Sequence, residues 1–184
     1  MDQGAENYAK YLHGDNAGLE WLVREYRHGL ILYINGIVKD MYTAEDLCED
    51  TFFRLITKKP RFDNRSSFKT WLYKIGRNIA YDGLRRQGLL QHADLSEADA
   101  EADRVSLESE VIKTERQRAL LKQLQNLPDS DRELIWLSYF EDMSAADVAR
   151  LTGKTVAATQ KALSRARQKL RIMMKEEGYE DENE

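Results

Sequence analysis

Apolar side chains recur at three- and four-residue steps through most of the chain, which is the period of an amphipathic α-helix. The first run lies between residues 15 and 40, where we expect one long helix or a broken pair. A second predicted helix begins at Thr43, whose hydroxyl can cap it with Asp46 as capping-box partner. It ends near Lys59, because Pro60 follows. No segment shows the pattern of a β-strand.

A third helix is predicted from about Ser67 to Arg86. Its apolar stripe consists of Phe68, Trp71, Leu72, Ile75 and Ile79. The residues predicted for the opposite face are Lys69, Tyr73, Arg77 and Tyr81. Because Trp71 shares the stripe of Phe68, we expect its ring in the core.

The stretch from residue 87 to 112 differs from both flanks, because it is rich in Ala, Glu and Asp and has little periodicity. That composition is typical of a mobile acidic linker. We therefore predict a domain over 1–86, a linker over 87–112, a second domain over 113–175 and an acidic tail over 176–184. The expected fold class is all-α, with two small helical domains joined by the flexible linker.

Near the C-terminus, two predicted helices are separated by a short turn at Gly153, where glycine suits a positive φ. Ser144 can cap the first helix and Thr155 the second. The apolar face of the second helix is predicted to be Val156, Leu163, Ala166 and Leu170. Such a pair is typical of a helix-turn-helix, whose second helix enters the major groove of DNA.

Charge is concentrated in two basic segments of a chain whose net charge is -4. Residues 54–86 hold ten basic side chains against two acidic ones, interleaved with aromatic rings. Basic groups follow a phosphate backbone while rings stack on unpaired bases, so this segment predicts a site for single-stranded nucleic acid. Residues 154–175 contain no acidic residue, which favours DNA contact over an ordinary solvated helix face.

Other function classes lack their sequence signals. Cys48 is the single cysteine, and the three histidines show no ligand spacing, so we expect no metal and no cofactor. There is no Gly-rich phosphate loop and no nucleophile elbow, and we expect no catalytic residues and no enzyme. Neither a membrane span nor a signal pattern is present, so we expect a cytoplasmic protein.

Three ordered segments resemble the extracytoplasmic-function (group IV) branch of the bacterial sigma-70 family. They are AEDLCEDTFFRL, then RFDNRSSFKTWLYKIGRNIAYDGLRR, then LPDSDRELIWLSYFEDMSAADVARLTGKTVAATQKALSRARQKL, and the likeness covers about 20–86 and 113–173. The resemblance implies a transcription initiation factor with a σ2 and a σ4 domain. Such a factor binds core RNA polymerase and directs promoter recognition and melting, here for a stress- or signal-responsive set of genes.

The resemblance also implies roles for particular residues. Core polymerase would be bound by Asp46, Leu47, Glu49, Asp50 and Arg54. The single-stranded −10 element would be bound by Phe62, Asp63, Asn64, Arg65, Ser66, Lys69, Tyr73, Lys74 and Arg77, since a flipped base needs polar groups and an apolar wall. The duplex −35 element would be read by Thr155, Gln160, Lys161, Ser164, Arg165 and Arg167. The chain departs from the family pattern at Lys154, at Thr159, where valine is common, and at Ala162.

An anti-sigma factor is a further expected partner, because the family is commonly held inactive by one. The acidic tail is hypothesised to mask the recognition helix, so deletion of 176–184 would raise the affinity of the free protein for DNA. The alternative is a stand-alone helix-turn-helix transcriptional regulator, which leaves the aromatic and basic segment 61–86 without a role.

Overall fold

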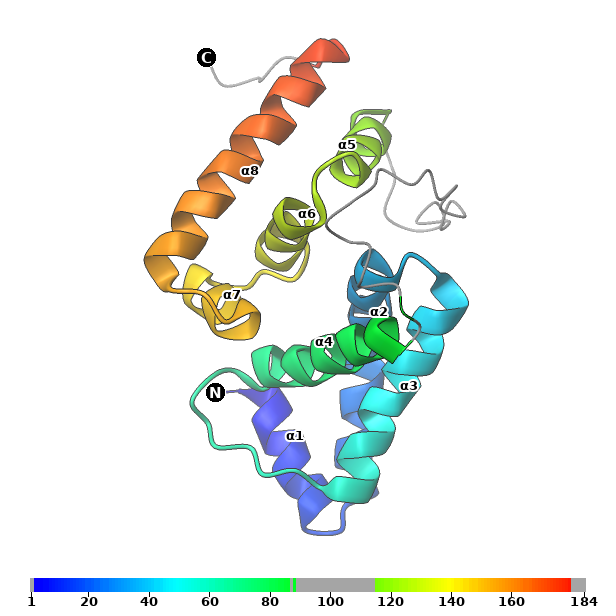
Figure 1. Ribbon diagram of the computed structural model, residues 1–184. Helices are drawn as coiled ribbons and strands as arrows, with labels where there is room; N and C mark the ends of the chain where they lie inside the picture. The colour runs from blue at the N-terminus through cyan, green and yellow to red at the C-terminus, as the bar shows by residue number, and fades with distance from the viewer. Residues whose placement is uncertain (1, 87, 89–114, 180–184) are drawn as a thin grey trace. The chain divides into compact units, whose positions relative to one another are not determined.

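The computed structural model describes residues 2–86, 88 and 115–179, whose regular elements are helices without any strand, as expected for an all-α protein (Figure 1). They form two compact units. The first contains α1 (Gln3–Leu12), α2 (Asn16–Val38), α3 (Met41–Lys58) and α4 (Phe68–Arg86). The second is built mainly from α5 (Glu115–Gln125), α6 (Asp129–Ile135) with its π-helical extension (Trp136–Phe140), α7 (Ala145–Thr152) and α8 (Val156–Glu176). The predicted linker lies outside the described residues except for Gly88.

Aspartates cap the first three helices. Asp2, Asp15 and Asp40 accept hydrogen bonds from backbone N–H groups in the first turns of α1, α2 and α3. The predicted start at Thr43 is wrong, because the Asp40 carboxylate accepts from the Thr43 amide at 2.7 Å and the helix already begins at Met41. Hydrogen bonds from the Thr43 side chain and backbone lower the pKa of Asp40. The segment 15–40 forms one unbroken helix rather than a pair.

The core of the first unit is built around α2, which packs against α1, α3 and α4. Leu30 and Ile34 of α2 are fully buried, as are Leu55 of α3 and Leu72 of α4. Gly76 allows the close approach of α4, since a Cβ there would lie 2.9 Å from Leu30 Cδ1. α4 is thus in contact with three helices, which fixes the helix that carries half of the ten basic residues of segment 54–86.

The core of the second unit lies where α5 and α6 pack against α8. Its buried cluster contains Leu124, Leu127, Ile135 and Ala166, with Trp136, Leu163, Leu170 and Met173 packed around it. The prediction for Val156 is wrong, because this side chain is 44% exposed. Thr159 is buried instead, since the packed side of the first turns of α8 passes through that position. Periodicity of apolar residues alone cannot reveal a buried threonine.

The helix-turn-helix capping follows the sequence expectation. The Asp147 amide donates to the Ser144 hydroxyl at 3.2 Å, and this hydroxyl donates to the Asp147 carboxylate at 2.5 Å. Gly153 has φ of +72° in the turn. The Thr155 hydroxyl accepts from the Ala158 amide at 3.2 Å, which caps α8. These contacts fix where α8 begins.

Candidate nucleic-acid interface

The loop between α3 and α4 displays three neighbouring polar side chains. Asp63, Asn64 and Arg65 are all exposed. The Asp63 carboxylate accepts from the Arg65 amide at 3.2 Å and pairs with the Arg65 guanidinium, also at 3.2 Å. Asn64 adopts a left-handed conformation with φ of +57°, which a residue with a short polar side chain tolerates. The tip of the loop therefore offers a carboxylate, an amide and a guanidinium in a tight turn.

An aromatic cluster forms the base of this loop. The ring of Phe62 lies edge-on to Phe68 with centroids 5.6 Å apart, and 5.3 Å from the ring of Trp71. Trp71 also packs against Phe68, which confirms its expected position in the stripe, although part of its side chain stays accessible. Phe62 and Trp71 together give the loop a half-buried apolar wall beside its polar tip.

The basic residues of α4 lie against aromatic rings. Lys69 sits over the ring of Tyr73 at 5.6 Å, and Arg77 over the ring of Tyr81 at 4.5 Å. Lys74 is exposed. These contacts hold positive charge along the helix that follows the loop.

Tyr73 requires a correction. Its side chain is 1% exposed, and its ring packs against Tyr33 of α2 with centroids 5.3 Å apart. The predicted polar face therefore does not run unbroken along α4, and Tyr73 presents no surface to DNA in this conformation. The physical reason is that α4 contacts three helices, so its buried arc is wider than a single apolar stripe.

The acidic residues of α3 form a separate exposed surface. Asp46, Glu49, Asp50 and Arg54 are all exposed, as a protein-binding face requires. Leu47 is half-buried, and a Cβ at Gly83 of α4 would lie 3.6 Å from its Cδ2 atom. The structure therefore separates Leu47 from the acids and places it at the contact between α3 and α4.

Three apolar side chains that were not predicted from the sequence belong to the same exposed surface of α3. Tyr42, Phe53 and Ile56 are exposed, with Phe53 at 62%. Their spacing places them in one helical stripe with Asp46 and Glu49. Large exposed apolar groups beside charged ones are typical of a protein interface. The sequence signal that could have identified them is that they are large apolar residues at positions outside the buried stripe of α3.

The side chains on α8 that were predicted to read the −35 element are exposed, but they do not all point the same way. Gln160, Lys161, Ser164 and Arg165 lie on the side away from the buried cluster, with Thr155 at the N-cap. Arg167 does not join them, because its guanidinium donates to the Tyr139 hydroxyl at 3.2 Å. The family resemblance had grouped Arg167 with the other four recognition-helix residues.

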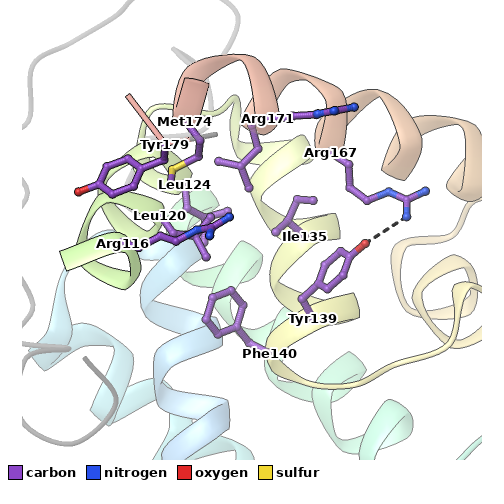
Figure 2. A pocket seen from close by; sticks show the side chains of 11 residues that line it. Arg116, Leu120, Leu124, Ile135, Tyr139, Phe140, Arg167, Arg171, Met174 and Tyr179 are labelled. Carbon is purple, nitrogen blue, oxygen red and sulfur yellow. Dashed lines mark hydrogen bonds between the residues drawn. The ribbon is translucent and has the colours of Figure 1, made fainter. Parts of the chain in front are cut away.

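Arg167 instead borders an apolar groove of about 450 Å³ in the second unit (Figure 2). The groove lies between α5, the π-helical turn and α8. Figure 2 shows Phe140, Leu120 and Ile135 facing this space, with Arg116, Arg167 and Arg171 around it. Its lining residues are Arg116, Leu120, Leu124, Ile135, Tyr139, Phe140, Arg167, Leu170, Arg171, Met174 and Tyr179. It combines apolar walls with positive charge.

Two properties of the described residues bear on other kinds of site. No group of three or more His, Cys, Asp or Glu side chains in residues 2–86, 88 and 115–179 is placed to hold a metal ion. Among the same residues, no helix has the length and apolar character needed to cross a bilayer.

Family comparisons match both units. The model for Sigma-70 region 2 matches residues 22–89, and that for Sigma-70, region 4 matches residues 117–170. The first match contains the loop and α4, and the second contains the helix-turn-helix. Together they cover well over half of the chain.

Curated relatives carry the same assignment. The ECF RNA polymerase sigma factor SigW of Bacillus subtilis is 24% identical over 89% of this chain and 92% of its own length. The RNA polymerase sigma factor CarQ of Myxococcus xanthus is 30% identical over 78% of this chain and 82% of its own. A Xanthomonas campestris protein named "Probable RNA polymerase sigma factor RfaY" is 34% identical over 74% of this chain, which spans only 35% of that longer protein.

A solved structure supports the same fold. The sigma factor RpoE of Bartonella quintana, in complex with the anti-sigma factor NepR, matches with a TM-score of 0.62 and 25% identity. The match covers 85% of this chain and 96% of that one. The two helical units, the order of their motifs and these matches lead to one conclusion: the chain belongs to the extracytoplasmic-function branch of the sigma-70 family of RNA polymerase sigma factors.

Proposed function

We propose that this chain binds core RNA polymerase, captures unpaired −10 bases with its first unit and reads the −35 duplex with its second. The observation that carries the proposal is the loop of residues 61–67, where a polar tip and an apolar wall meet at the start of a basic helix. A flipped base needs such a combination, and neighbouring phosphates need the positive charge.

At the −10 element, the loop residues and the helix have different tasks. Asn64 and Ser66 supply hydrogen-bonding groups, and Phe62 supplies the apolar wall. Asp63 and Arg65 hold the tip in its turn and add polar groups of their own. The basic residues that would contact the phosphates are Lys69, Lys74 and Arg77. Tyr73 is left out of this set because it is buried.

At the −35 element, α8 supplies the base and phosphate contacts. Arg165 and Lys161 point away from the helix packing, together with Gln160 and Ser164, so they can enter a major groove. Thr155 lies at the helix N-terminus, where a phosphate is favoured by the free N–H groups and the helix dipole. Arg167 is assigned instead to the groove of the second unit.

Core polymerase would bind the exposed surface of α3. The acids Asp46, Glu49 and Asp50 suit a basic partner, and Phe53 and Tyr42 add apolar area that becomes buried on binding. Phe53→Ser should therefore weaken binding to core polymerase by roughly tenfold, as expected for the loss of an apolar anchor. Ile172→Ser, which changes an exposed apolar residue on α8, is the matched control.

We further propose that a protein inhibitor regulates this chain, as NepR forms a complex with RpoE. The groove of the second unit suits a partner segment with apolar and acidic side chains, because apolar walls lie beside three arginines. The chain would act in the bacterial cytoplasm with its polymerase. Nucleotide chemistry would belong to the core enzyme, with no catalytic residue in this chain.

The test mixes the purified full chain with bacterial core polymerase and transcribes a randomised promoter library, with RNA 5′ ends mapped. The expected result is a set of discrete starts that depend on both components and share −10 and −35 sequences. Tight binding of the chain alone to a duplex operator, without core-dependent starts, would instead favour a stand-alone helix-turn-helix regulator.

A further inference from the structure

Helix α1 and its N-cap Asp2 lie before the segment that matches Sigma-70 region 2. They nevertheless contact Pro60 and Phe68, which flank the loop of residues 61–67, called the −10 loop below. We propose that Asp2 and Tyr8 are positioning residues, which hold residues 61–67 in the conformation that reads the −10 element. This inference rests on the proposed role of that loop. Neither residue touches DNA in the proposal, and both act through the loop backbone and its aromatic base.

Asp2 holds the end of the loop with a carboxylate that serves two helices at once. One oxygen accepts from the Ala5 amide at 3.1 Å and caps α1. The other accepts from the Phe68 amide at 2.5 Å, at the first residue of α4. A carboxylate has two equivalent acceptor oxygens, whereas a carboxamide has only one. The double contact therefore requires aspartate rather than asparagine.

Tyr8 holds the beginning of the loop. Its hydroxyl donates to the Pro60 carbonyl at 2.7 Å, directly before the loop. Its ring packs against Phe68 and Trp71, with centroids 5.3 and 5.4 Å away. Burial raises the pKa of Tyr8 to about 12, so the hydroxyl stays neutral and able to donate even at pH values well above physiological. One side chain thus ties the loop backbone to the aromatic wall beneath it.

α1 packs closely against the start of α4, so its contacts can hold the loop in place. A Cβ at Gly4 would lie 2.7 Å from Phe68 Cδ1 and 2.6 Å from the Tyr26 hydroxyl, so the helix backbone lies directly on the first residue of α4. The loop is fixed at both ends, and its exposed residues lie between them. Fixing a recognition loop before binding lowers the ordering entropy that binding must overcome.

Two substitutions isolate the contacts without removing the helix. Asp2→Asn keeps one acceptor to cap α1, because asparagine caps as well as aspartate, but it cannot also bind the Phe68 amide. Tyr8→Phe removes the hydroxyl and keeps the ring. The matched controls are Asp15→Asn, which loses the same charge at a cap with one hydrogen bond, and Tyr11→Phe, whose hydroxyl contacts Ile56 of α3 at 3.4 Å.

The first measurement follows the loop itself in the full chain. Limited trypsin digestion, with fragments identified by mass spectrometry, reports cleavage after Arg61 and Arg65, both exposed in the loop. The Asp2→Asn and Tyr8→Phe double variant should be cut there about three- to tenfold faster, as expected when a net hydrogen bond is lost at each end. The control double variant should be cut at the wild-type rate. Equal rates for the two double variants would overturn the proposal.

The second measurement is promoter selectivity with core polymerase, which a merely structural role would leave unchanged. The ratio of transcription from the preferred −10 sequence to single-base variants should fall by about three- to tenfold in the test double variant. Affinities for core polymerase and for −35 duplex should match those of the control. A loosened loop with unchanged −10 selectivity would contradict the positioning role.

The two measurements separate this proposal from the function on which it rests. If wild-type protein with core polymerase shows no −10 dependence, the proposed function fails, whatever the digestion shows, and the positioning role falls with it. If the wild type depends on the −10 sequence and the test variant behaves like the control, only the positioning role fails.

Discussion

Single side chains on the two candidate DNA surfaces differ in how they are held. Lys69 lies over an aromatic ring of its own helix at the margin of the loop, whereas Arg165 is exposed on α8, away from the packed side. A cation beside a loop suits contact with phosphates, and a guanidinium on a recognition helix suits bidentate contact with a base. Equal charges are therefore expected to have unequal effects on specificity.

This difference predicts the outcome of two alanine substitutions. Arg165→Ala should cost roughly 1–3 kcal/mol at promoters with the preferred −35 base and less at promoters without it. Lys69→Ala should weaken all promoters alike and reduce the salt slope of binding by about 1. Open-complex formation at each promoter, measured over a series of salt concentrations, tests both predictions. A sequence-selective loss at Lys69 would contradict its assignment to phosphate.

Thr159 offers a prediction about stability. Its side chain is fully buried, and its hydroxyl oxygen has no hydrogen-bond partner within the part of the chain that the structure describes. Thr159→Val, which restores the residue common in the family, should stabilise the second unit by roughly 1 kcal/mol, because a buried unsatisfied hydroxyl is removed. Thermal denaturation measures the gain. Thr57→Val, at an exposed hydroxyl that donates to Phe53, should give none.

Among the helices, α6 is tied to α5 by one arginine. Arg132 donates to the backbone carbonyls of Leu124, Gln125 and Leu127 at 2.9 to 3.2 Å and pairs with Asp129 at 3.1 Å. Burial lowers the pKa of its guanidinium, while Asp129 opposes that shift. The last carbonyls of a helix have no backbone N–H partner within that helix, and Arg132 supplies donors to those at the end of α5. It thereby fixes the joint between α5 and α6 and, with it, one side of the groove.

Arg132→Met tests this joint. The variant keeps an apolar stem but leaves the carbonyls at the end of α5 without their guanidinium partner, so the second unit should lose roughly 2–4 kcal/mol of unfolding free energy. Urea denaturation followed by fluorescence reports on this unit when Trp21 and Trp71 of the first unit are replaced by Phe, which leaves Trp136, packed against the buried cluster, as the emitter. Arg118→Met, at an exposed position on α5, is the control and should leave the transition unchanged.

On the scale of the whole molecule, the acidic tail 176–184 directly follows the basic segment 154–175. Glu177 is part of the second unit, because its carboxylate accepts from Lys122 at 3.0 Å and from Gln123 at 2.6 Å. The acids at 180, 181, 182 and 184 follow it and lie outside the described residues. A test of tail masking must therefore leave Glu177 in place.

The corresponding prediction concerns residues 180–184. Their deletion should raise the affinity of the free protein for −35 duplex about two- to fivefold at low salt, since surface charges interact weakly and are screened. Fluorescence anisotropy gives the affinity. Replacement of the four acids by Gln and Asn at constant length should reproduce the gain. An unchanged affinity in both variants would exclude masking by the tail.

Local sequence was sufficient for several of the helices and for some of their ends. Helical periodicity predicted α2, α4 and α8, and the cap at Ser144, the cap at Thr155 and the turn at Gly153 are where the residues indicated. These features depend on neighbours within one or two turns, so a linear pattern contains them. The helix α1 was missed because it is only ten residues long and its buried positions are Gly4, Tyr8 and Tyr11, which a search for aliphatic residues at helical spacing passes over.

Tertiary packing decided which side chains remain available at the candidate sites. Tyr73 shares a helical face with Lys69 and Arg77 in sequence, but the contact of α4 with α2 buries it. Arg167 belongs to the groove because Tyr139 lies opposite, and Phe53 is exposed because no helix among the residues that the structure describes covers its side of α3. The sequence by itself determined the family, the all-α class and the basic segments. Only the tertiary structure decided how both ends of the loop of residues 61–67 are held, since Asp2 and Tyr8 reach residues more than fifty positions away.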